Sequence, residues 1–158
     1  MRNRLFFIST SLLVAMLAFT IVASAADSNV GTWKLNLAKS TYSPGPAPKS
    51  ATLTIEGHYG GIKYTSHGEN AQGATVHVEF AGKYDGMDNP VTGSADFNSI
   101  SLKRIDAHMI ESTNKKDGKV MATNTAVVSK DGKTRTLTQR GKNAAGQDIH
   151  NVIVYDRQ

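Results

Sequence analysis

Histidine is the residue type in this chain best suited to binding a metal. The chain has five: His58, His67, His77, His108 and His150. A metal site needs three or four ligands that converge on one point. His67 and His77 flank a turn predicted at residues 70–73, so they would face each other across a hairpin, with His58 nearby. The chain has no Cys and no tightly spaced cluster of His, Asp and Glu. We therefore interpret these histidines as exposed residues and expect no metal and no cofactor.

The residues that could act as catalysts do not form a recognisable pattern. Ser94 follows Gly93, but no second Gly completes a Gly-x-Ser-x-Gly turn, and Cys is absent. Asp85 and Asp88 lie in an Asp-Gly-x-Asp sequence that resembles a fragment of a calcium loop, yet the other oxygen ligands and the closing Glu are missing. We interpret these acids as solvated turn residues and predict no enzyme activity.

Polar and aromatic side chains that point into a β-barrel would instead suit binding of a small amphipathic molecule. Arg104 has the same strand parity as Ile100 and Leu102, which assigns it to the inner face. The candidate ligand-binding residues on this reasoning are Arg104, Tyr84, Tyr155, Tyr64 and Phe80, and Asn124 and Asn151 are further polar residues of inward parity. The alternative is that these polar groups form the wet end of a barrel without a cavity.

Strands are the elements that must position these side chains, because the apolar residues recur with period two. Val76, Val78 and Phe80 share one parity, while His77 and Glu79 share the other. Residues after position 25 have no helical period. The predicted strands are 31–37, 50–57, 62–69, 74–84, 99–105, 108–116, 119–129, 133–142 and 147–156, with a short extra strand near 90–92.

Turn residues at close and even spacing separate these segments. Asp-Gly pairs at 85–86, 117–118 and 131–132 are typical of tight hairpins, and the sequence Lys-Asp-Gly-Lys around the last two predicts the same hairpin tip twice. Only residues 38–49 and 86–98 form longer connections. The sequence therefore predicts an all-β fold, an antiparallel up-and-down meander of about 8–10 strands that closes into a barrel. A two-sheet sandwich is the competing architecture.

Residues 1–25 have the three parts of a secretory signal peptide. Arg2 and Arg4 form a short basic region, an apolar run follows, and Ala23-Ser24-Ala25 places small residues at a cleavage site. The alternative is a signal anchor that stays in the membrane, since the run is near the lower length limit for spanning. We predict a signal peptide at 1–25, a single barrel domain at 26–158, and a periplasmic or secreted bacterial protein with no stable membrane anchor after cleavage.

The net charge of +5 is not evidence for nucleic-acid binding. Without Arg2 and Arg4, 16 basic and 13 acidic residues remain, which leaves +3. These charges are interspersed and lack interleaved aromatic residues, so we predict no nucleic-acid partner.

The sequence Gly31-Thr32-Trp33-Lys34-Leu35 resembles the opening strand of two families of ligand-holding barrels. Gly-x-Trp is similar to the lipocalin signature, and the whole segment is similar to the start of the fatty-acid-binding proteins; both belong to the calycin superfamily. The chain also resembles uncharacterised exported bacterial lipocalin-like proteins. The resemblance implies a calycin-like barrel that holds a small hydrophobic or amphipathic molecule. It departs from the fatty-acid-binding proteins at Ile153, which stands where their last strand has Arg.

Gly31 and Trp33 are predicted to have structural roles. A lone Trp on the first strand would close one end of the barrel, and Arg157 or Arg140 would cover its ring. The predicted function is an exported small-molecule binding protein of lipocalin-like type. The alternative is a cell-envelope protein-interaction or inhibitor module with a solid barrel, and the oligomeric state stays open.

Overall fold

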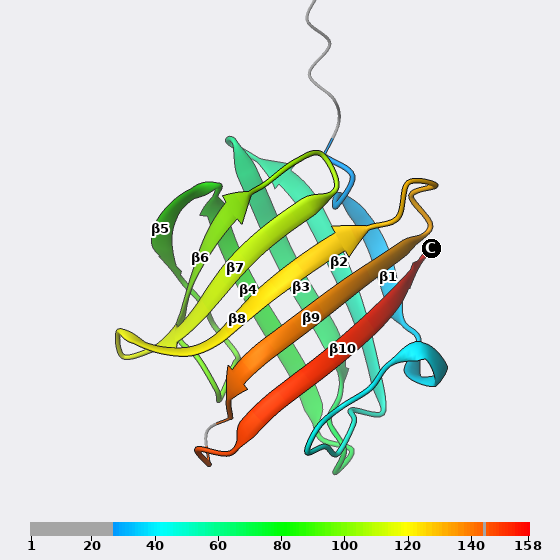
Figure 1. The fold of residues 1–158 in the computed structure, drawn as a ribbon, viewed down its shortest axis with the longest axis vertical. Helices are drawn as coiled ribbons and strands as arrows, with labels where there is room; N and C mark the ends of the chain where they lie inside the picture. Colours follow the sequence, from blue (N-terminus) through cyan, green and yellow to red (C-terminus); the bar gives the residue numbers. More distant parts are fainter. Residues whose placement is uncertain (1–26, 144) are drawn as a thin grey trace, which may run out of the picture.

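The computed structural model describes residues 27–143 and 145–158, which form one antiparallel sheet of ten strands (Figure 1). The predicted signal peptide at 1–25 lies outside the described residues. Within the described part of the chain, no helix has the length and hydropathy needed to cross a membrane. The strands are β1 (Gly31–Leu35), β2 (Ser50–His58), β3 (Gly61–Glu69), β4 (Thr75–Lys83), β5 (Asp85–Pro90), β6 (Ser99–Arg104), β7 (Met109–Lys116), β8 (Lys119–Val128), β9 (Thr134–Lys142) and β10 (Asp148–Arg157).

The predicted all-β, up-and-down barrel is confirmed. Each strand pairs with its neighbours in sequence, except that β4 and β5 do not pair with each other. β1 also pairs with β10, so the strand order is β4-β3-β2-β1-β10-β9-β8-β7-β6-β5. In Figure 1, β6 to β10 cross in front of β2 to β4. This nearly closed barrel is compatible with a calycin-like fold. The chain also has one short 3₁₀-helix, η1 (Leu37–Lys39).

The barrel has a seam between β4 and the segment that follows β5. A single bridge joins the two sides: the Glu79 N–H donates to the Thr92 carbonyl at 3.1 Å, and the Thr92 N–H donates to the Glu79 carbonyl at 3.0 Å. Gly93 lies so close to β4 that a Cβ there would be 1.7 Å from the His77 carbonyl oxygen. Glycine at this position therefore lets the segment after β5 approach β4 closely enough to form this bridge. The bridge covers part of the β4 edge, which would otherwise be unpaired.

Two turn predictions were wrong in detail. Residues 85–86, predicted as a tight turn, belong to β5, whose pairing with β6 shifts register between Asp85 and Asp88; the chain reverses at Tyr84 instead. The two Lys-Asp-Gly-Lys sequences also differ. Asp117 and Gly118 both have positive φ, as in a two-residue hairpin, whereas only Gly132 does in the second. There the Asp131 carboxylate accepts from Ser129 Oγ and from the Lys133 N–H, which stabilises a wider loop.

The long connection after β1 covers the edge of β10. β1 pairs with β10 only as far as Leu35 and Tyr155. Beyond that point Thr41 forms a bridge with Val152, and the His150 N–H donates to the Ser43 carbonyl at 2.9 Å. The longer connection predicted at residues 38–49 thus continues the wall of the barrel at Thr41 and Ser43.

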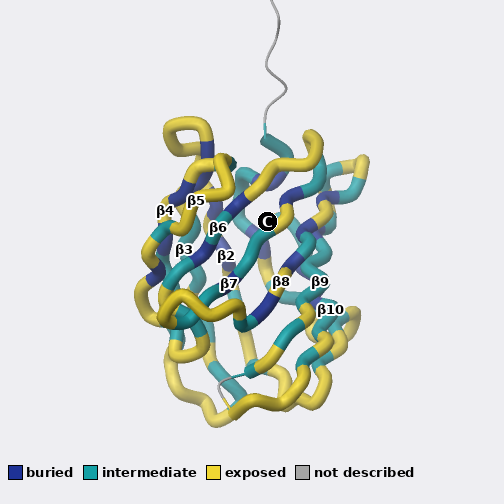
Figure 2. Tube along the Cα trace, turned by 60° about the vertical axis from the view of Figure 1, so that its left-hand side comes forward, coloured by how far each residue is buried: buried dark blue, intermediate teal, exposed yellow. Residues whose placement is uncertain are grey.

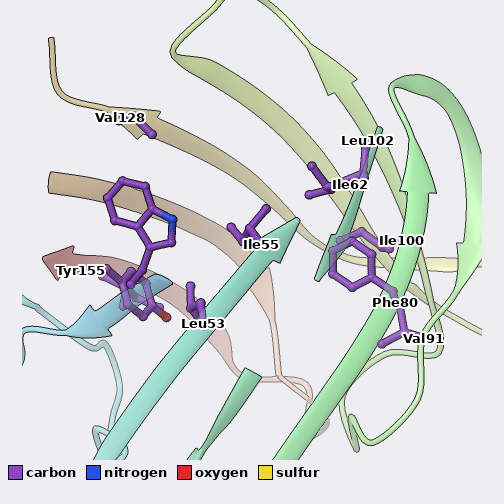
Figure 3. Close-up of a cluster of buried hydrophobic side chains, with 11 residues drawn as sticks. Leu53, Ile55, Ile62, Phe80, Val91, Ile100, Leu102, Val128 and Tyr155 are labelled. Carbon is purple, nitrogen blue, oxygen red and sulfur yellow. The ribbon is translucent and has the colours of Figure 1, made fainter. Parts of the chain in front are cut away.

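The core lies inside the barrel, where alternate residues of each strand point. Figure 2 shows exposed residues concentrated in the loops at both ends and buried residues along the strands. Figure 3 shows Leu53, Ile55, Phe80 and Tyr155 among the buried side chains that face one another across the interior. The strand residues that make this core are Trp33, Leu53, Ile55, Ile62, Phe80, Ile100, Leu102, Val128, Ile153 and Tyr155.

Candidate ligand-binding cavity

One end of the barrel is closed by Trp33, which is fully buried. Its indole N–H donates to the Asn29 carbonyl at 2.9 Å, and the Arg157 guanidinium lies 4.1 Å from the ring centroid. Arg157 also donates to the carbonyls of Val30 and Ser28, at 2.9 and 2.7 Å. Gly31 makes room for this arrangement, because a Cβ there would lie 2.4 Å from an Arg157 nitrogen. A cation over a buried indole and three hydrogen bonds to backbone carbonyls hold this end together.

Asp27, just before β1, is bound at the same end of the barrel. Its carboxylate accepts a hydrogen bond from the Tyr84 hydroxyl and pairs with Arg104, whose guanidinium lies 4.4 Å from the Tyr84 ring centroid. Partial burial raises the pKa of the Asp27 carboxyl, but the hydrogen bonds from Tyr84 and Asn29 and the charge of Arg104 outweigh it, so the pKa lies below its ordinary value. Arg104 and Tyr84 therefore bind a segment of the chain itself.

A cavity of about 220 Å³ lies within the barrel between the Trp33 end and the opposite end. Most of its wall is apolar, with a small number of polar groups, which is the usual make-up of a small-molecule site. Its lining comprises Ile62, Tyr64, Ser66, Val78, Phe80, Phe97, Ile100, Leu102, Ile110, Ser112, Asn114, Asn124, Ala126, Arg135, Leu137 and Gln139. Tyr64 and Phe80 stack within this wall, with ring centroids 4.7 Å apart.

A groove of about 330 Å³ adjoins the cavity at the end of the barrel away from Trp33. Phe97, Asn114 and Gln139 line both spaces and therefore lie between them; we call these three residues the neck. The groove is bounded by the connection that covers β10, including Tyr42 and Pro44. A ligand that enters through this groove would reach the cavity past the three neck residues.

Arg135 is the buried charge of the cavity. It lies on β9, is 7% exposed, and donates from Nε to the Asn29 side-chain oxygen at 3.3 Å. Among the described residues, no carboxylate lies within ion-pair distance of it. Burial lowers the pKa of the guanidinium from its ordinary value. Arginine nevertheless keeps its proton in proteins, so the cavity wall contains a cation without a carboxylate in direct contact, and the charge of Asp27 acts on it only from a distance.

Three polar side chains form a second cluster in the cavity wall, on β7 and β8. The Asn124 amide nitrogen donates to Ser112 Oγ and to the Asn114 side-chain oxygen, both at 3.1 Å. The Asn124 Oδ1 atom is buried and has no hydrogen-bond partner. Nearer the neck, the Asn151 amide donates to Gln139 Oε1 at 2.9 Å. Asn124 therefore lines the cavity with other atoms, while its unpartnered side-chain oxygen is enclosed by the protein.

The structure separates the residues that the sequence singled out as ligand contacts. Tyr64 and Phe80 line the cavity, whereas Arg104, Tyr84 and Tyr155 do not. Tyr155 is buried in the core, and burial raises its pKa above the ordinary value. Arg135 was missed, although it has the same parity as Leu137 and could have been assigned inward by the argument that was applied to Arg104.

His67 and His77 face each other across β3 and β4, as the hairpin predicts. Their Nδ1 atoms are 3.0 Å apart, and His77 Nε2 lies 3.3 Å from a Glu79 carboxylate oxygen. His58 is not part of this pair. Over the described ranges, no group of three or more His, Cys, Asp or Glu side chains is arranged to hold a metal ion.

Comparisons of the chain with protein families, curated proteins and solved structures found no match.

Proposed function

We propose that this protein is an exported barrel of calycin type that binds one small amphipathic molecule in its interior. The observation that carries the proposal is the cavity of about 220 Å³, whose wall is largely apolar and contains Arg135 without a carboxylate partner. Burying a cation is unfavourable unless an opposite charge compensates it. A ligand with an anionic head and an apolar body would satisfy both features of the wall.

The position of Arg135 favours one orientation of the ligand. Arg135 pairs in register with Tyr155, toward the closed end, and Gln139, on the same strand, lies at the neck. A ligand whose anionic head reaches Arg135 would therefore extend its apolar part past Leu137 toward the groove. Tyr64 and Phe80 would contact that part from the opposite wall.

Binding can be tested on protein that has been unfolded and refolded to remove bound lipid. Nile red, a neutral dye that fluoresces in apolar surroundings, should bind saturably at one site per chain, and decanoate should displace it. Arg135→Gln should weaken decanoate binding by about 1.5–3 kcal/mol, on the order of 10- to 100-fold, because it removes a charge-assisted hydrogen bond. Displacement by decanol should change much less.

The matched control is Arg140→Gln, the same change at an exposed residue of β9. Arg104→Gln tests the sequence prediction directly: a selective loss of decanoate binding in that variant, with Arg135→Gln unaffected, would move the anion site to the closed end. Circular dichroism checks that each variant is folded. Absence of saturable dye binding by folded wild-type protein would contradict the proposal and favour the interaction module with a solid barrel.

A further inference from the structure

The outer face of β3 and β4 carries a histidine pair that the cavity does not explain. His67 and His77 are exposed and lie directly opposite each other in the antiparallel register, while the next residues along the two strands, Ser66 and Val78, line the cavity on the other face. The two ring centroids are 4.2 Å apart, and the two Nδ1 atoms are 3.0 Å apart. A ring nitrogen that carries no proton is a metal ligand, so the pair places two such ligands side by side.

The separation of the two nitrogens fits a single metal ion. Imidazole nitrogens bind divalent transition metals at about 2.0–2.1 Å. Two nitrogens at adjacent corners of a square-planar ion are then about 2.8–3.0 Å apart, and two on a tetrahedral ion about 3.3–3.4 Å apart. The 3.0 Å between His67 Nδ1 and His77 Nδ1 is closer to the tetragonal geometry that Cu²⁺ prefers.

Glu79 provides the outer contact that metal-binding histidines usually have. Its Oε1 atom is 3.3 Å from His77 Nε2. A proton on Nε2 donates to this carboxylate, which leaves the His77 Nδ1 lone pair free on the side of His67. Metal-ligating histidines almost always donate their second ring N–H in this way, and the contact orients the ring and makes it a better ligand. Glu79 therefore favours the tautomer of His77 that binds metal through Nδ1.

The side chains around the pair suit a cation. In the register of β2, β3 and β4, the five positions that flank the pair on the outer face, all within the described residues, carry hydroxyl or carboxylate groups and no Lys or Arg. These positions are Thr52, Thr65, Glu69, Thr75 and Glu79. Two carboxylates near the pair attract a bound cation, and no basic side chain at these positions opposes it.

We propose that His67 and His77 bind one divalent transition-metal ion on the outside of the barrel, Cu²⁺ most tightly. Each histidine supplies one nitrogen, Glu79 orients His77, and water occupies the remaining positions. Copper is preferred because affinity at nitrogen sites rises along the first-row divalent series up to Cu²⁺. The sequence argument against a metal required three converging ligands, whereas this site has two, so its affinity is lower than that of a structural zinc site. The site lies outside the barrel and is independent of the cavity and its ligand.

Calorimetric titration with CuCl₂ tests the site on the chelator-treated exported protein, purified without an affinity tag. One Cu²⁺ should bind per chain, ZnCl₂ should bind more weakly, and MgCl₂ should not bind, because Mg²⁺ prefers oxygen ligands. The electron paramagnetic resonance spectrum of the Cu²⁺ complex should show two nitrogen ligands. This spectrum distinguishes the paired site from copper held by one histidine.

Variants assign the ligands. His67→Gln and His77→Gln should each weaken Cu²⁺ binding by more than about 10-fold, and Glu79→Gln, which removes only the outer contact, by about 10-fold. His58→Gln and His150→Gln make the same change at exposed histidines of β2 and β10 and are the matched controls, which should leave the affinity unchanged. Circular dichroism checks that each variant is folded.

The outcomes decide the site directly. Loss of the Cu²⁺ site in both His67→Gln and His77→Gln, with both controls unchanged, supports the proposal. Binding to wild-type protein that is no tighter than binding to the double variant His67→Gln, His77→Gln overturns it, as does a spectrum with a single nitrogen ligand. Unchanged affinity in Glu79→Gln overturns the orienting role of Glu79. Decanoate and dye binding in the cavity are measured separately, so failure of either proposal leaves the other standing.

Discussion

At the scale of single residues, the closed end depends on Trp33 and the groups around it. The indole is fully buried, donates to the Asn29 carbonyl and lies beneath the Arg157 guanidinium. Trp33→Ala should lower the free energy of unfolding by roughly 3–5 kcal/mol, because it removes a large core side chain and leaves a cavity. Urea denaturation measures this loss. Tyr59→Ala, at an exposed aromatic residue, should leave the midpoint nearly unchanged, and an equally small effect at Trp33 would disprove its role.

Asp27 makes a pH-dependent contribution at the same end. Its folded-state pKa lies below the ordinary value, so its stabilisation is present above the unfolded pKa of about 3.9 and is lost as pH falls through the lower folded pKa. Asp27→Asn should cost about 1–3 kcal/mol at neutral pH, and the difference from wild type should shrink in acid below about pH 4. Urea unfolding across pH measures it, with the exposed Glu56→Gln as control. A difference independent of pH would contradict the ionised contact.

At the scale of secondary-structure elements, the seam between β4 and the segment after β5 depends on Gly93. Gly93 has φ +81°, and a Cβ there would lie 1.7 Å from the His77 carbonyl oxygen. Gly60 has nearly the same φ, +80°, and nothing within 4 Å of such a Cβ. Gly60→Ala should therefore cost only the backbone strain, about 1–2 kcal/mol, while Gly93→Ala should cost more and separate the two edges.

Amide hydrogen exchange tests the seam at the bridge itself. The Glu79 and Thr92 amides should exchange faster in Gly93→Ala than in wild type, because their mutual hydrogen bonds are lost, and should stay protected in Gly60→Ala. Equal protection in the two variants would show that the seam does not depend on the close approach of Gly93.

At the scale of the whole molecule, the barrel has a closed end and an open end, and Asp27 lies at the closed one. We expect the exported protein to begin at Ala26 or Asp27, since small residues occupy the cleavage positions before both. Either start retains the Asp27 carboxylate for Tyr84 and Arg104. Intact-mass analysis of the exported form measures the cleavage point, and retention of residues 1–25 would contradict the prediction.

The sequence by itself determined the strands and most of the turns. The alternation of Val76, Val78 and Phe80 with polar residues predicts a half-buried strand, because successive side chains point to opposite faces of a sheet. Asp117-Gly118 predicts a two-residue hairpin, because both residues adopt positive φ there. Such features depend on a few neighbouring residues, so they can be recognised from a single amino-acid sequence. The wider loop around Asp131 could not be recognised in this way, because it depends on hydrogen bonds that the Asp131 side chain accepts in the folded protein.

Only the tertiary structure decided which inward residues share a site. Parity assigns a side chain to the inside or the outside, but its level along the barrel follows from the register and tilt of all ten strands. Arg104 ends β6 and therefore lies at the closed end with Asp27, whereas Arg135, four residues before Gln139 on β9, reaches the cavity. The unpartnered oxygen of Asn124 likewise follows from the pairing of β7 with β8, which brings Ser112 and Asn114 to its nitrogen and leaves the oxygen buried without a hydrogen bond.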